Sequence, residues 1–216
     1  QEVVKRALLA SDLMGNRLSP LGTSPWSTAG VTNAYNDPLL KYTSPNDGTQ
    51  KFNSLALQLQ MVARLIETSQ GSSLGMSRQF FMVNLGGFDF HDKLIADQAE
   101  RLAMLDHALA YFDQVLRSMP SGDLSSQVTT FTASEFGRTF TSNGDGTDHG
   151  WGGHQFVVGG AVRGTEVYGT FPTYSSADAQ GVFSSTDQIH NGILIPTTSV
   201  DHLAYTLGRW MDVSHS

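Results

Sequence analysis

The residues best suited to carry chemistry in this 216-residue chain lie in two groups. The first group, Asp89 and His91, occupies a glycine-rich turn that begins at Gly86. The second group sets imidazoles and carboxylates among glycines between positions 134 and 154: Glu135, Asp148, His149 and His154. Imidazole and carboxylate groups together suit divalent cations such as Zn, Mn, Fe, Mg or Ca, according to geometry. The two groups therefore predict a metal site.

Both groups also have a structural interpretation that involves no metal. Asp89 and Asp92 can cap a following helix, because the first turn of a helix favours negative charge. A cap does not account for His91, so we favour ligation for Asp89 with His91 and capping for Asp92. The residues of the second group can instead be solvated loop side chains, with the glycines allowing a tight backbone path. The presence of both groups favours ligation.

Three further side chains are candidates for direct chemistry on a substrate. The planar guanidinium of Arg138 can hold phosphate, sulfate or carboxylate. Alternatively, Arg138 forms a salt bridge to Glu135 or Asp148 and orients the loop. Ser134 and Thr139 carry hydroxyls that can serve as a metal ligand or a nucleophile, although hydroxyls are common after strands.

The predicted elements place the two groups at the ends of strands. The apolar run 79–85 predicts a strand covered on both faces, as in parallel sheets. Apolar spacings of three and four predict a helix over 92–117, and β-branched residues predict a second strand over 127–132. Strand, helix and strand in this order predict a right-handed βαβ crossover. Ligands collect at the carboxyl ends of parallel strands, so we expect the groups to converge.

The rest of the chain predicts a single domain with a long loop. Other expected elements are a helix over 1–14, a loop over 15–50, a helix from Ser54 to Gln70, a short strand near 155–158, short strands or extended passages at 166–168 and 192–195, and a last helix after Thr198 or Ser199. Ser54 is the expected N-cap of the second helix. The last helix turns Leu203, Leu207 and Trp210 inward.

Composition excludes several classes of protein. The net charge of −7 and the absence of a Lys/Arg cluster argue against a nucleic-acid partner. No apolar run approaches the length of about 18 residues that would span a membrane. There is no cysteine, which excludes disulfides and thiolate metal sites. The chain starts at Gln1 without a basic or apolar leader, so we expect a targeting signal to be removed or absent.

Several motifs in fixed order resemble the DUF1501 family. The main ones are Gly86-Gly87-Phe88-Asp89-Phe90-His91, Thr132-Ala133-Ser134-Glu135-Phe136-Gly137-Arg138-Thr139, Asp148-His149-Gly150-Trp151-Gly152-Gly153-His154 and Gly159-Gly160-Ala161-Val162-Arg163-Gly164. The resemblance covers nearly all of residues 50–213. That family is similar to the alkaline phosphatase and sulfatase superfamily, and its members are typically bacterial and exported with a twin-arginine signal. The resemblance implies a three-layer α/β/α sandwich with a mostly parallel sheet, and a periplasmic or extracellular location.

The resemblance also implies roles for individual residues. Asp89 and His91 stand where the superfamily has an Asp and His ligand pair, and residues 134–137 stand where phosphatases have Ser-Asp-His-Gly. Glu135 can still bind a metal but Phe136 cannot, so a second metal depends on Asp148, His149 or His154. The superfamily's first ligand and its nucleophile have no counterpart here. We therefore expect an incomplete fold, the C-terminal part of a longer domain, whose partner is the missing N-terminal part or another chain.

These observations lead to two functional hypotheses. The first is an exported metal-binding protein resembling metal-dependent hydrolases of phosphate or sulfate esters, with a divalent Zn, Mn, Mg or Ca ion and an anionic small-molecule ester as substrate. The second is a binding or assembly protein that keeps a degenerate phosphatase-like scaffold without turnover. Phe136 and the missing nucleophile favour the second.

Overall fold

The computed structural model describes residues 4, 11, 15, 18–70 and 78–213. The chain divides into two units. The helical unit comprises Gln1–Gly87, Ala99–Val128 and Gly159–Ala161; the hairpin unit comprises Phe88–Gln98, Thr129–Val158 and Val162–Ser216. The helix predicted over 1–14 lies almost wholly outside the described residues.

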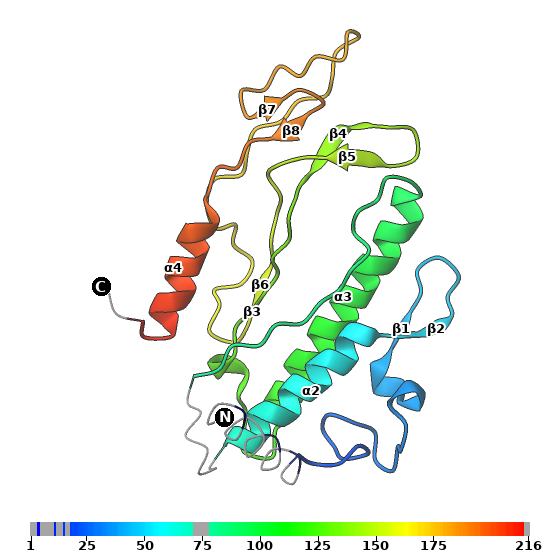
Figure 1. Ribbon diagram of the computed structural model, residues 1–216, viewed down its shortest axis with the longest axis vertical. Helices are drawn as coiled ribbons and strands as arrows, with labels where there is room; N and C mark the ends of the chain where they lie inside the picture. Colours follow the sequence, from blue (N-terminus) through cyan, green and yellow to red (C-terminus); the bar gives the residue numbers. More distant parts are fainter. Residues whose placement is uncertain (1–3, 5–10, 12–14, 16–17, 71–77, 214–216) are drawn as a thin grey trace. The chain divides into compact units, whose positions relative to one another are not determined.

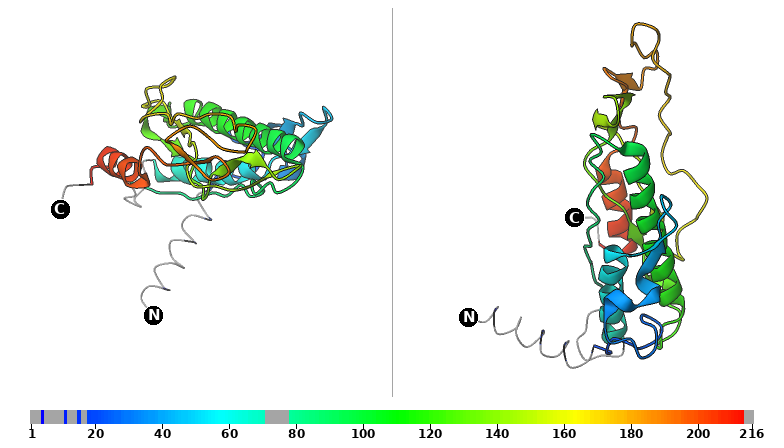
Figure 2. Two further views of the ribbon diagram at one scale, coloured as in Figure 1. Left: turned by 90° about the horizontal axis from the view of Figure 1, so that it is seen from above. Right: turned by 90° about the vertical axis from the view of Figure 1, so that its right-hand side faces the viewer.

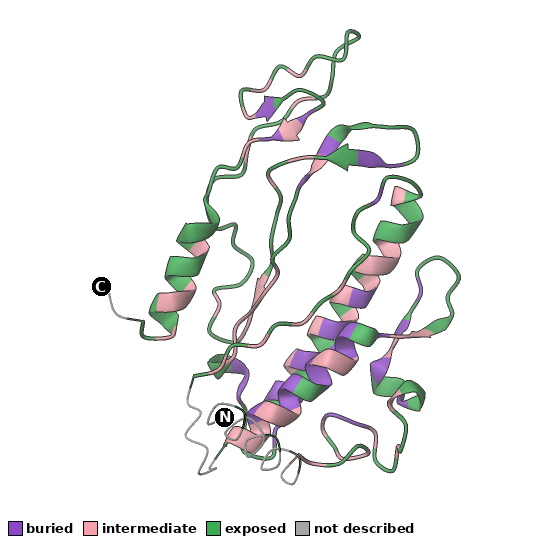
Figure 3. Ribbon diagram, in the orientation of Figure 1, coloured by how far each residue is buried: buried purple, intermediate pink, exposed green. Residues whose placement is uncertain are grey.

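Two amphipathic helices form the core of the helical unit. Helix α2 (Ser54–Ser69) lies beside α3 (Leu94–Arg117) in Figure 1 and in the further views of Figure 2. Figure 3 shows their facing sides buried, and the core side chains that meet there are Leu55, Leu59, Val62, Ile66, Ala108, Tyr111, Phe112, Val115 and Leu116. Burying one such large apolar side chain stabilises the fold by about 1.5–3 kcal/mol. Both predicted helices are therefore confirmed. The prediction succeeded because the apolar residues of each helix recur with the helical period and line one face.

A buried asparagine joins the start of α2 to α3. The Asn53 side-chain oxygen accepts hydrogen bonds from the backbone N–H groups of Leu55 and Ala56, so Asn53 is the N-cap and the expectation of Ser54 was wrong by one residue. Its Nδ2 donates to the Met104 carbonyl (2.7 Å) and lies 3.1 Å from His107 Nδ1. Burial lowers the pKa of His107, which favours a neutral ring that accepts this bond.

The segment predicted as a long loop contains short elements that polar contacts hold in place. They are the 3₁₀ helices η1 (Ala34–Asn36) and η2 (Pro38–Leu40) and the antiparallel strands β1 (Lys41–Thr43) and β2 (Gln50–Phe52). Buried Asp37 accepts hydrogen bonds from Ser27 and Thr28. Glu100 of α3 accepts from Tyr42 and Lys51. These contacts fix an otherwise irregular segment against the helices.

The described strands are short and antiparallel. Besides β1 and β2, they pair as β3 (Thr130–Phe131) with β6 (Val157–Val158), β4 (Arg138–Ser142) with β5 (Thr147–His149), and β7 (Gln188–Ile189) with β8 (Ile193–Leu194). The predicted three-layer α/β/α sandwich with a mostly parallel sheet is therefore wrong, and so is the βαβ crossover. Of the two alternatives for residues 166–168, a short strand or an extended passage, the strand is excluded.

The apolar run 79–85 explains this error. Phe81, Val83 and Leu85 pack against the helical core, whereas Met82 between them is exposed. The run is thus covered on one face only, and its described residues belong to no β-ladder. A continuous apolar sequence cannot distinguish a strand inside a sheet from an extended segment lying on helices.

The hairpin unit ends in α4 (Val200–Trp210), which confirms the predicted last helix. None of its residues is buried, as Figure 3 shows, so the expected inner face of Leu203, Leu207 and Trp210 is not part of a described core. A last 3₁₀ turn, η3 (Ser125–Gln127), belongs to the helical unit. Among the described helices, none combines the length and the hydropathy that a membrane crossing requires.

Candidate metal centre

Two segments of the hairpin unit carry the candidate ligands. Residues 89–91 precede α3, and His149 ends strand β5. Backbone hydrogen bonds join the two segments: the Thr147 N–H donates to the Phe90 carbonyl (3.1 Å) and the Leu94 N–H to the Asp145 carbonyl (3.0 Å). The candidate ligands therefore meet because the turn before α3 lies along the β4–β5 hairpin.

Gly146 allows this close approach. A Cβ at this position would lie 2.5 Å from the carbonyl oxygens of both Phe90 and His91. Real Cβ atoms do not come that close to backbone oxygens, so any other residue would push the two segments apart. The sequence alone gave no sign of this role, because the contact joins residues more than fifty positions apart.

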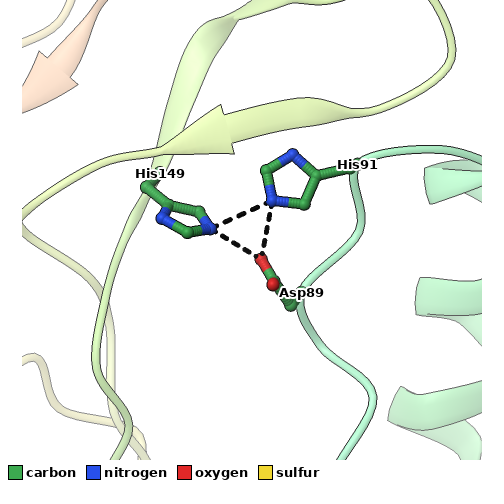
Figure 4. Close-up of side chains that lie close together, drawn as sticks. All are labelled: Asp89, His91 and His149. Atoms are coloured by element: carbon green, nitrogen blue, oxygen red, sulfur yellow. Dashed lines mark hydrogen bonds and ion pairs between the residues drawn. The ribbon is translucent and has the colours of Figure 1, made fainter.

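Asp89, His91 and His149 form a triangle of ligand atoms (Figure 4). Asp89 Oδ1 lies 3.2 Å from His91 Nε2 and 3.0 Å from His149 Nε2, and the two nitrogens lie 3.0 Å apart. Two ligands of a tetrahedral ion with bonds of about 2.0–2.1 Å stand about 3.3 Å apart. One proton on a ring nitrogen can satisfy only one neighbour well, whereas a cation can contact all three atoms. The three residues therefore fit a divalent metal ion.

The Asp89 carboxylate is kept ionised, as a metal ligand must be. Desolvation by itself raises the pKa of Asp89. The hydrogen bond from Arg138 and the neighbouring imidazoles of His91 and His149 outweigh this effect and hold the pKa below its ordinary value.

Arg138 contacts both ligand-bearing segments. Its Nη1 donates to Asp89 Oδ1 (2.5 Å), its Nε to Thr147 Oγ1 (3.1 Å), and its Nη2 to the carbonyls of Phe90 (2.8 Å) and Thr147. The loop-orienting salt bridge considered above is present, but its partner is Asp89. These bonds use four of the five guanidinium N–H groups, which leaves one for an anion.

With this geometry in hand, the comparisons place the chain in a family. Residues 73–216, which include the whole triangle, match the family described as a protein of unknown function (DUF1501). The chain belongs to the DUF1501 family. Searches of curated proteins and of solved structures found no match for it. The description of the DUF1501 family assigns no activity to its members.

In the DUF1501 chain, Asp148 stands behind the triangle. Its Oδ1 lies 3.6 Å from Nδ1 of His91, the ring nitrogen that does not face the other ligands. This distance is too long for a hydrogen bond but is within ion-pair range. Asn143 Nδ2 donates to the same oxygen at 3.2 Å. Carboxylates in this position orient ligating histidines and raise their basicity.

Two other predicted ligands of the DUF1501 protein lie outside the triangle. Glu135 is exposed and does not belong to the described ligand cluster. The His154 ring stacks on Phe171, with 4.7 Å between the ring centroids. The structure therefore brings together three of the six residues predicted to bind metal.

The two candidate hydroxyls are engaged in other contacts. Ser134 Oγ accepts a hydrogen bond from Gln155 Nε2 (3.1 Å). Thr139 is buried; its Oγ1 donates to the Thr141 carbonyl and accepts from the Asp148 N–H. In this arrangement, Thr139 supports the strand that carries the site.

Proposed function

We propose that this DUF1501 protein binds one divalent transition-metal ion through Asp89, His91 and His149. The observation that carries the proposal is the triangle of one carboxylate oxygen and two imidazole nitrogens. Mg²⁺ and Ca²⁺ prefer sites made of oxygen ligands, whereas imidazole suits Zn²⁺ and its first-row neighbours. Zn²⁺ and Mn²⁺ are therefore better candidates than Mg²⁺ or Ca²⁺.

The reaction that fits such a centre is hydrolysis of a phosphate or sulfate ester of a small anionic molecule. Three protein ligands with a further position open to solvent are typical of catalytic rather than structural zinc sites. A bound ion supplies Lewis-acid polarisation of the ester and lowers the pKa of water. Because Ser134 and Thr139 are engaged elsewhere, we propose water as the nucleophile. The resemblance of the motifs to the phosphatase and sulfatase superfamily supports this substrate class.

A second candidate function is metal-dependent binding or assembly without turnover. Phe136 favours it, because its ring packs on the His149 imidazole with 4.1 Å between centroids and a phenyl ring cannot bind a second metal. The partner would be the N-terminal part of a longer protein or another chain. The same family resemblance supports export to the periplasm or beyond the cell, which fractionation of cells expressing the full-length gene would test.

Metal binding is the first experiment. Chelator-treated protein is titrated with Zn²⁺ and Mn²⁺ by calorimetry, and bound metal is measured after dialysis. We expect one equivalent in the wild type and none in Asp89→Ala or His149→Ala, with His202→Ala, an exposed histidine of α4, as the control that keeps binding. A wild type that holds no stoichiometric metal contradicts the proposal.

The second experiment separates the two functions. The metal-loaded protein is assayed with p-nitrophenyl phosphate and p-nitrophenyl sulfate. Turnover that disappears in Asp89→Ala and survives in His202→Ala supports the hydrolase. Stoichiometric metal without turnover supports the binding protein.

A further inference from the structure

We propose that Arg138 is the positioning residue of the metal centre. Its guanidinium fastens the segment that carries Asp89 and His91 to the hairpin that carries His149. The expected effect on metal affinity rests on the proposed metal-binding function. The hydrogen bonds by which Arg138 joins the two segments are present without an ion.

The hydrogen bonds of Arg138 are divided between the two segments. On the first segment they reach Asp89 Oδ1 and the Phe90 carbonyl; on the hairpin they reach the hydroxyl and carbonyl of Thr147. A guanidinium is planar and its donors have fixed directions. One rigid group, together with the backbone hydrogen bonds, therefore restricts the distance and the angle between the two segments.

The location of Arg138 on the hairpin strengthens this role. Arg138 of β4 and His149 of β5 are direct partners in the strand register. The backbone of Arg138 is thus paired with the backbone of one ligand, while its side chain bonds to another ligand, Asp89. Arg138 therefore links Asp89 to His149 through one residue, in addition to the backbone bonds between the two segments.

Exposure shows why such a residue is needed. The side chains of Asp89, His91 and His149 are 62%, 48% and 49% exposed, whereas that of Arg138 is 21% exposed. Exposed side chains sample several rotamers, and a bound ion must restrict them. Hydrogen bonds from a charged, partly buried donor are stronger than those of exposed neutral groups. Arg138 therefore lowers the entropy loss of binding by holding Asp89 in place beforehand.

The Phe90 carbonyl is the junction of the two segments. It accepts from Arg138 Nη2 and also from the Thr147 N–H, next to the close backbone approach at Gly146. When the guanidinium is removed, the Phe90 carbonyl keeps only its hydrogen bond from the Thr147 N–H as a link to the hairpin. The Thr147 amide is therefore a reporter of the fastening that does not depend on metal.

The first test measures Co²⁺ affinity by its visible absorption in the wild type, Arg138→Lys and Arg138→Ala, with exposed Arg163→Ala as the matched control. Lysine keeps the charge but lacks the planar fork. Residues that orient ligands typically change metal affinity about 10- to 100-fold, so we expect this loss in both Arg138 variants at unchanged stoichiometry. Millimolar guanidinium, but not sodium chloride at the same ionic strength, should restore part of the affinity of Arg138→Ala. Folded Arg138 variants that bind Co²⁺ as the wild type does overturn the inference.

The second test uses metal-free protein and follows hydrogen exchange of the Thr147 amide by NMR. We expect faster exchange in Arg138→Lys, while the Leu124 amide, bonded to the Leu116 carbonyl in the helical unit, stays unchanged. Unchanged exchange at Thr147 overturns the inference. If the wild type binds no Co²⁺, the proposed function fails and this measurement still decides the role of Arg138. If Arg138→Ala does not fold, Thr147→Val replaces it in the Co²⁺ titration. This variant removes the Thr147 hydroxyl that accepts the hydrogen bond from Arg138 Nε.

Discussion

The phenyl ring of Phe136 packs on the imidazole of His149, with 4.1 Å between centroids and 37° between the ring planes. A histidine at position 136 could itself bind a metal, whereas a phenyl ring cannot. In this protein the same position supports a ligand instead of supplying one. We therefore expect a residue that cannot bind metal to influence how well the proposed centre binds it.

Phe136→Ala should weaken metal binding without removing a ligand. The exposed His149 ring loses the surface that limits its rotation, so we expect an affinity loss of about tenfold, at the low end for residues that orient ligands. Calorimetric titration with Zn²⁺ measures it. Phe136→Tyr, which keeps the ring, is the control; equal losses in both variants would show that the ring does not orient His149.

Gly146→Ala should damage the site through the backbone. The added methyl group meets the carbonyl oxygens of Phe90 and His91, so the hairpin must move away from the turn. We expect a stability loss of about 1–3 kcal/mol, typical of overpacking, together with weaker metal binding. Denaturant unfolding and Zn²⁺ titration measure the two effects. Gly164→Ala is the control because its Cβ would meet nothing within 4 Å, and a Gly146→Ala protein that behaves like it contradicts the prediction.

Asn53→Ala should destabilise the helical unit. It removes the cap of α2 and the bond to the Met104 carbonyl, and we expect a loss of about 1–3 kcal/mol. Asn53→Asp keeps an oxygen that can cap α2, so it should destabilise the protein less. It still removes the side-chain N–H that donates to the Met104 carbonyl. Asn33→Ala removes the cap of the three-residue helix η1 at an exposed site and serves as control, with an expected change within about 0.5 kcal/mol. Equal unfolding midpoints for the Asn53→Ala and Asn33→Ala proteins would rule out the proposed link between α2 and α3.

Stability should fall above pH 10. Burial, together with the hydrogen bond to Glu100, raises the pKa of Tyr42 to about 12. A folded-state pKa above the unfolded value means that the unfolded chain releases the phenolic proton first. The stabilisation is therefore complete below about pH 10 and is lost as the pH rises toward 12. Burial also raises the pKa of Tyr111, so Tyr42→Phe should flatten the decline only in part. Thermal melts from pH 8 to 11.5 measure it, and exposed Tyr174→Phe should leave the slope unchanged.

The sequence predicted those features that depend on neighbours along the chain. Helices α2, α3 and α4 follow from apolar spacing, which reports one face of a helix directly. Asp89 with His91 could be named because both residues lie in one turn. His149 could be named as a candidate but not separated from His154, since a list of ligand types does not say which rings face the same point.

Features that depend on contacts between distant segments were not predictable. The run 79–85 has the composition of a sheet strand. In the described part of the chain it forms no strand and packs against the helical core instead. The sequence predicted, as one of two alternatives, a salt bridge from Arg138 to Glu135 or Asp148, which are close along the chain. The observed partner, Asp89, lies 49 positions away. The close backbone approach at Gly146 and the hydrogen bonds between the two segments bring these residues together.

The exposure of the three ligands has a kinetic consequence. Water reaches the proposed ion directly, so exchange with the surrounding solution does not have to wait for the protein to open. Affinity of nitrogen and oxygen sites for divalent ions rises toward Cu²⁺ along the first transition row. The metal found in a purified sample will therefore reflect the last buffer or column the protein met, and the physiological ion has to be sought in the compartment where the protein works.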